Sequence, residues 1–199
     1  MSRNQKRITP DDLMPLAEYQ KARKERREKI LQIKQHRRIE VGPYAAFYFE
    51  NYDTMLQQVQ EMLYIEKGGE AQIEDELSAY NPLIPQGEEL VCTLLLEVED
   101  PNRRDRILRT LSYIENHIFM QIGSDRIPAV ILPGEDRTRE DGKTSSVHFL
   151  RFPFTPAQIA AFRDPAQSVS LGIAHENYAH IAPLSQASRE TLAGDFDMA

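Results

Sequence analysis

The segment ELVCTLLLEVE, residues 89–99, has the two-residue period of a β-strand. One of its faces is wholly apolar, made of Leu90, Cys92, Leu94, Leu96 and Val98. Upstream of this segment the apolar residues recur at helical spacing, whereas downstream further alternating runs follow. The sequence therefore places helices first and most strands later.

Three more strand regions are expected, the first of them a hairpin of residues 117–122 with 127–132, followed by residues 145–154 and 168–174. Helix starts are marked by a capping side chain before a proline, at Thr9-Pro10, Asp100-Pro101 and Thr155-Pro156. From Pro101 we expect a helix through Glu115, and a last helix follows Ser185. Grouped strands with short hairpins favour an α+β fold, an antiparallel sheet backed by helices.

The N-terminal part is expected to be helical. One basic helix is predicted from Pro10 to about Ile39, where Gly42-Pro43 breaks it. A second is predicted over FENYDTMLQQVQE, residues 49–61, ending near Gly68-Gly69. We therefore expect a long basic N-terminal helical arm, residues 1–40, and an α+β domain, residues 41–199.

Composition restricts the class of protein. The chain has 199 residues, 41% of them hydrophobic and 28% charged, which is typical of a globular protein. A secretory leader and a membrane span are not expected, so the predicted location is the cytoplasm. The single cysteine, Cys92, excludes an internal disulfide and a cysteine-ligated iron-sulfur cluster within the chain.

The net charge of -7 is unevenly distributed, because residues 1–40 hold 12 Lys and Arg against 6 acids. Residues 21–38 alone carry nine Lys and Arg and two Glu. Such a helix can neutralise nucleic-acid phosphates, but no aromatic platform or reading motif accompanies it. A solvated helix, anchored on the acidic body of the protein, is the preferred interpretation.

Acidic and amide side chains suggest one candidate site. Glu50, Gln57 and Glu61 share a stripe at helical spacing, and Glu97 lies on the mixed face of its strand. Carboxylates held close together can act as acid and base or bind a hard cation. The alternative is a solvated helix face. Glu-x-x-His pairs of a di-metal centre are absent from the sequence, so no metal is predicted.

Three residues on strands complete the candidate set. His148 and His175 alternate with apolar neighbours, which is more typical of core histidines than of ligands or bases. Arg151 is an unusual charge within a strand, expected to pair with Glu97 or to hold an anionic ligand. The polar segment 133–144 is expected to be a mobile loop.

Phosphate loops, dinucleotide fingerprints and nucleophile elbows are absent from the sequence. Its ordered motifs resemble an uncharacterised bacterial domain-of-unknown-function family across nearly the whole chain. The motifs include residues 38–43 (RIEVGP), 49–51 (FEN), 80–85 (YNPLIP), 147–152 (VHFLRF) and 177–178 (NY). The resemblance implies genes encoded near rubrerythrin-like proteins and iron-sulfur proteins related to heterodisulfide reductase. It supplies no activity, cofactor or catalytic residue.

The leading hypothesis is a non-catalytic accessory or interaction protein in a bacterial redox or peroxide-defence setting, with rubrerythrin-like or iron-sulfur partners implied by the resemblance. One alternative is a small-molecule or metal-binding enzyme that uses the carboxylate-rich pocket. Another is nucleic-acid binding through the basic arm.

Overall fold

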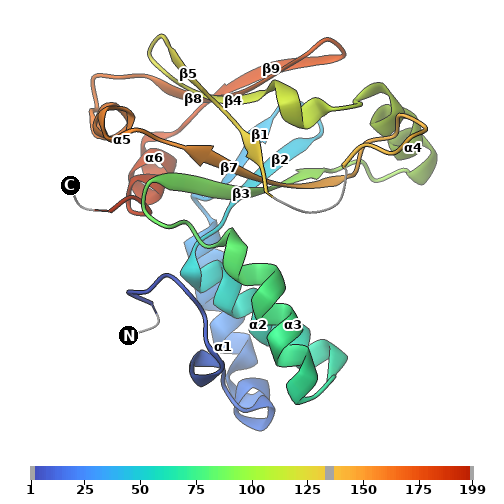
Figure 1. Ribbon diagram of the computed structural model, residues 1–199, viewed down its shortest axis with the longest axis vertical. Helices are drawn as coiled ribbons and strands as arrows, with labels where there is room; N and C mark the ends of the chain where they lie inside the picture. The colour runs from blue at the N-terminus through green and yellow to red at the C-terminus, as the bar shows by residue number, and fades with distance from the viewer. Residues whose placement is uncertain (1–2, 133–136, 198–199) are drawn as a thin grey trace.

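The computed structural model describes residues 3–132 and 137–197, which fold as an α+β protein. Two antiparallel sheets face each other, with three helices extending from one side (Figure 1). The first sheet has the strand order β1-β2-β3-β7-β6 and the second β5-β4-β8-β9. The strands are β1 Arg38–Val41, β2 Ala45–Phe49, β3 Glu89–Leu96, β4 Ile118–Ile122, β5 Asp125–Pro128, β6 Val130–Ile131, β7 Val147–Pro153, β8 Val169–His175 and β9 Tyr178–Pro183.

The inner faces of the two sheets form one hydrophobic core. The apolar face predicted for the segment around Leu90 and Leu94 is buried in it, opposite Met120 and Leu171 of the second sheet. Cys92 is a free, fully buried thiol in this core, and burial raises its pKa well above the ordinary value. The thiol is therefore protonated and shielded from reagents.

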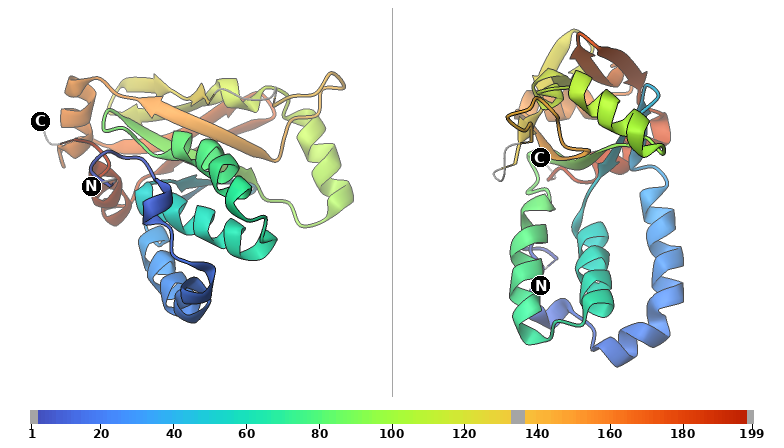
Figure 2. Two further views of the ribbon diagram at one scale, coloured as in Figure 1. Left: turned by 60° about the horizontal axis from the view of Figure 1, so that its bottom comes forward. Right: turned by 90° about the vertical axis from the view of Figure 1, so that its right-hand side faces the viewer.

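Helices cover the ends of the sandwich and form a separate projection (Figures 1 and 2). The projection consists of α1 Leu16–Lys34, α2 Tyr52–Glu66 and α3 Glu70–Tyr80, while α4 Pro101–Thr110, α5 Pro156–Arg163 and α6 Gln186–Ala193 lie beside the sheets. Short 3-10 helices occupy Pro10–Asp12, Asn81–Leu83 and Ile114–His117.

A second apolar cluster joins the projecting helices to the outer face of the first sheet. Met55, Val59 and Leu63 of α2 pack there with Val91 of β3. Helix α1 packs into the three-helix projection through Tyr19, whose side chain is fully buried. Helix α1 thus contacts α2 through Tyr19, Arg23 and Arg26.

One buried ion pair connects distant parts of the chain. Arg37, just after α1, donates to both carboxylate oxygens of Asp195, just after α6, at 2.8 and 2.7 Å. Each side chain is only 6% exposed. The end of α1 is thereby held beside the C-terminal helix.

The prediction of a first helix from Pro10 to about Ile39 was wrong. Residues 10–12 form a 3-10 helix, α1 starts at Leu16 and ends at Lys34, and β1 follows. Gly42 has φ +70°, and a Cβ there would overlap the ring of His180 and the hydroxyl of Tyr178. Gly42-Pro43 is therefore the turn of the β1–β2 hairpin rather than a helix break, and the division expected after residue 40 falls inside β1.

The second predicted helix begins too early, because Phe49 belongs to β2 and Asn51 caps α2 by accepting a hydrogen bond from Thr54. The expected end near Gly68 is confirmed, with Lys67 in the left-handed conformation. The helix predicted through Glu115 ends at Thr110. Strand β9 was not predicted, and the expected strand 127–132 is divided between the two sheets as β5 and β6.

Candidate functional site

Gln57 and Glu61 lie where α2 meets α1. The Tyr19 hydroxyl donates to Glu61 Oε2 at 2.6 Å and accepts from the Gln57 amide. Arg23 of α1 donates to the same carboxylate from Nε at 3.1 Å and forms an ion pair with it. The Arg23 guanidinium lowers the pKa of Glu61, whereas burial and then the bond to Glu61 raise the pKa of Tyr19 to about 12. These side chains join two helices.

Glu50 lies between β2 and α2 and is 6% exposed. Its Oε2 accepts from the Thr54 hydroxyl at 2.7 Å and its Oε1 from the Thr93 hydroxyl at 3.0 Å. Thr54 lies in the first turn of α2 and Thr93 on β3. The Glu50 carboxylate therefore fastens the helix to the sheet.

Glu97 follows β3 and is partly exposed. It accepts from the Tyr48 hydroxyl at 2.7 Å and from Arg38 at 2.9 Å. Burial and then the bond to Glu97 raise the pKa of Tyr48. The Arg38 ion pair takes the place that the sequence suggested for Arg151, whose guanidinium lies 3.9 Å from Glu89.

The three candidate carboxylates, Glu50, Glu61 and Glu97, thus have three different sets of partners. The structure does not bring them together as the acid and base of one pocket. Within residues 3–132 and 137–197, no group of three or more His, Cys, Asp or Glu is arranged to hold a metal ion.

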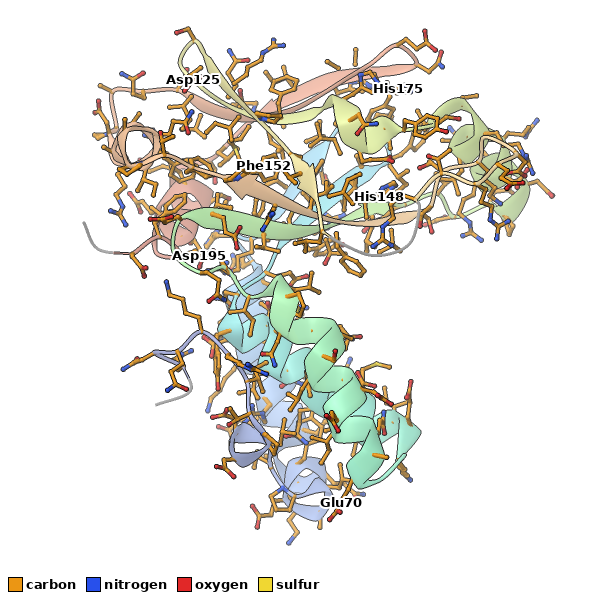
Figure 3. The ribbon with its side chains drawn as sticks, in the orientation of Figure 1. Glu70, Asp125, His148, Phe152, His175 and Asp195 are labelled. Carbon is orange, nitrogen blue, oxygen red and sulfur yellow. The ribbon has the colours of Figure 1, made fainter. Side chains whose placement is uncertain are left out.

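His148 and His175 are both buried, near the end of the sandwich that carries α4 (Figure 3). His148 Nε2 lies 2.9 Å from the Ser145 carbonyl, and its Nδ1 faces Glu115 Oε2 at 3.7 Å. Burial is the main cause that lowers the pKa of His148 to about 4. The ring is therefore neutral at neutral pH, with Nε2–H donating to the carbonyl. His175 is held by the Ser112 carbonyl, 3.1 Å from Nε2.

An open groove lies on α1 and α2, away from the sheets. We call it the α1–α2 groove, a hollow of about 530 Å³ lined by Gln20, Arg23, Lys24, Arg27, Glu28, Leu31 and Tyr64. Arg23 stacks over the Tyr64 ring, 4.8 Å from its centroid. Leu31 is 67% exposed, so the groove offers apolar surface together with cations.

Several residues that organise these clusters were not predicted from the sequence, among them Arg23, Tyr48 and Glu115. The partners of Glu61 and Glu97 lie 38 or more positions away in the chain. Local spacing contains no signal for such pairs. Tyr19 is the exception, because an apolar ring within a strongly basic helix predicts a face that packs against the body of the protein, and Tyr19 is indeed buried.

Fold and clusters together define an α+β protein with a two-sheet sandwich and a three-helix projection that carries a basic, partly apolar groove. Within the described residues, no helix is both long and apolar enough to cross a membrane.

The chain belongs to the family described as protein of unknown function (DUF3501), whose model matches residues 7–196. It is also similar to a crystal structure of a protein of unknown function from Burkholderia pseudomallei K96243. That similarity has a TM-score of 0.88 and 33% identity, and it covers 96% of this chain and 99% of the other. No curated protein matches the chain.

Proposed function

We propose that the protein is a non-catalytic interaction protein of the cytoplasm, which binds an acidic partner protein through the α1–α2 groove. The observation that carries the proposal is the composition of this groove, in which cations surround an exposed leucine. Protein interfaces commonly combine an apolar centre with a charged rim.

Charge determines the kind of partner. Helix α1 holds seven Lys and Arg against three Glu. Arg23 is already paired with Glu61, and Arg27 acts on the same carboxylate from a longer distance. Neither Lys24 nor Arg27 forms an ion pair of its own with a carboxylate of the described residues. An acidic surface would supply the missing counter-charges and speed association through long-range attraction.

The enzyme hypothesis is less well supported by the geometry. Glu50, Glu61 and Glu97 are each engaged by hydroxyl or guanidinium groups from other elements. Carboxylates with such partners stabilise the contacts between helices and sheet and are not free to act on a substrate.

We further propose that the partner belongs to a redox or peroxide-defence system, and this part of the proposal rests on the family resemblance alone. A rubrerythrin-like protein or an iron-sulfur protein would then be the acidic partner. With Cys92 as its only cysteine, this chain would act beside the electron carrier rather than carry a cysteine-ligated cluster itself.

The test is a pull-down from the native host, compared across three baits: the wild-type protein, the double variant Arg27→Glu/Leu31→Glu, and the control Lys29→Glu. Lys29 is an exposed α1 cation that does not line the groove and is paired with Glu25. We expect an acidic redox protein to be enriched by the wild type and the control and lost with the double variant.

The purified partner should then bind the wild type directly, with an affinity that falls as salt is added. If no redox protein is enriched, the redox version fails. Equal capture by all three baits would refute the proposal that the α1–α2 groove is the binding surface. Binding of an oligonucleotide that the double variant abolishes, without any protein partner, would replace the proposal by nucleic-acid binding.

A further inference from the structure

Helix α4 lies at one end of the sandwich, beside the segment before β7 (Figure 1). A second hollow, separate from the α1–α2 groove, is lined by residues of both. We call it the basic cavity; its volume is about 370 Å³. Four cations line it, Arg104 from α4 and Arg137, Arg139 and Lys143 from the segment before β7. Leu108 and the hydroxyl side chains of residues 144–146 complete the wall.

Among the residues that the structure describes, no carboxylate lines the basic cavity, although the whole chain carries a net charge of -7. Lys143 is neutralised by Asp105 at 2.6 Å, outside the lining. Asp105 is shared with Arg109, which also pairs with Asp141 at 2.9 Å. These two carboxylates balance Lys143 and Arg109, and the uncompensated charge is that of the three arginines in the lining. Concentrated positive charge in an acidic protein is costly unless an anion relieves it.

No ion pair joins these arginines to a carboxylate of the described residues, although Arg139 adds a weaker interaction with Asp141, whose pKa is lowered mainly by the Lys143 amide and by Arg109. Arg104 donates to the Val98 carbonyl at 3.3 Å. Arg137 lies over the Phe149 ring, 5.1 Å from its centroid, and its buried Nε has no hydrogen-bond partner. Guanidinium groups positioned in this way keep their charge, and their N–H donors that are neither bonded nor buried remain available for a ligand.

The wall of the basic cavity is preorganised by backbone bonds. The Thr144 amide donates to the Leu108 carbonyl at 3.1 Å, and the Ser145 amide to the Arg137 carbonyl at 2.6 Å. The Arg139 amide donates to the Lys143 carbonyl at 2.9 Å. Residues 133–136 of the loop expected to be mobile lie outside the described residues, but the part that lines the cavity is fastened to α4 and to itself.

A buried polar pair lies beneath this wall. His148 is 0% exposed, and its Nε2 bonds to the Ser145 carbonyl. His148 Nδ1 and Glu115 Oε2 both lack a hydrogen-bond partner among the described residues. Buried polar groups without partners are rare in folded proteins and often mark a functional position.

We infer that the basic cavity binds a small anion that carries phosphate groups. Guanidinium forks and hydroxyl donors match phosphate oxygens, and the volume lies within the range of about 300 to 1,000 Å³ typical of small-molecule sites. This site lies apart from the α1–α2 groove, so the inference does not depend on the proposed partner protein.

The inference is tested by isothermal titration calorimetry on the full chain, with pyrophosphate as the probe and citrate as a carboxylate anion of comparable charge. We expect pyrophosphate to bind with an affinity that falls as salt is added. Arg104→Gln removes a cation from exposed α4, and it should weaken binding about tenfold, as expected for one charge-assisted hydrogen bond.

Lys29→Gln removes the same charge from α1 and should leave pyrophosphate binding unchanged. Unchanged melting temperatures would establish that both variants are folded. Three results would each overturn the inference: no binding of pyrophosphate at low salt, equal loss in both variants, or citrate binding as tightly as pyrophosphate.

Discussion

Mild acid should destabilise the folded protein through His148. The side chain is fully buried, and burial lowers its pKa from 6.5 to about 4. Two titratable groups face the ring, Glu115 at 3.7 Å from Nδ1 and the more distant Arg137, which also lowers the pKa. In the unfolded chain the ring takes up a proton as the pH falls through 6.5, whereas in the folded chain it resists until about 4.

The direction and size follow from proton linkage. The unfolded state binds more protons between the two pKa values, so the stability present above pH 6.5 is lost as the pH falls toward 4. From about pH 8 to about pH 5 the loss attributable to His148 amounts to about 2 kcal/mol. For a chain of this size that corresponds to a melting temperature lower by about 4 to 8 °C.

The measurement is urea unfolding of the wild type and of His148→Gln at about pH 8 and about pH 5. The variant should be less stable at the higher pH, since it disturbs the core. Its further loss on acidification should be smaller than that of the wild type by about 2 kcal/mol. Equal losses in the two proteins would refute the reasoning, and would mean that Glu115 holds the imidazolium as tightly as water does.

Two other substitutions test the contacts that hold the architecture together. Arg37→Met should lower the free energy of unfolding in urea by about 3 to 5 kcal/mol, because it leaves Asp195 buried without its partner. The double variant Arg37→Met/Asp195→Leu should recover most of that loss. A double variant as unstable as the single one would contradict this interpretation. Tyr178→Phe should lower the free energy of unfolding by about 1 to 3 kcal/mol, because the hydroxyl donates to the Val41 carbonyl at 2.7 Å and accepts from the Tyr44 amide at 2.9 Å. A melting temperature equal to that of the wild type would count against this role of Tyr178.

The sequence predicted the local features of the fold well. Thr155 forms the expected capping box at the start of α5, and Asp100 caps α4 by accepting from the Arg103 amide at 2.6 Å. These devices act within four residues, so their signal is complete in the local sequence. The strand around Leu94 is likewise confirmed, because alternation is a local pattern.

What sequence reasoning missed depends on distant residues. Phe49 fits the helical stripe of α2 by spacing, yet it pairs with Cys92 in the first sheet. Helix and strand periods coincide over so short a run, and only the partner strand decides between them. The partners of the candidate site residues were missed in the same way, because Glu61 and Glu97 accept hydrogen bonds from residues of other elements that no local pattern indicates.

The Arg37–Asp195 ion pair also has a consequence for biosynthesis. The two residues are 158 positions apart, so the ion pair cannot form before the ribosome has synthesised Asp195. Until then the nascent chain exposes a cation that the finished protein buries. Closing so long a loop makes this contact a late step in folding. Truncation of the chain before Asp195 should therefore leave the buried Arg37 guanidinium without its counter-ion, although the missing residues lie at the opposite end of the chain.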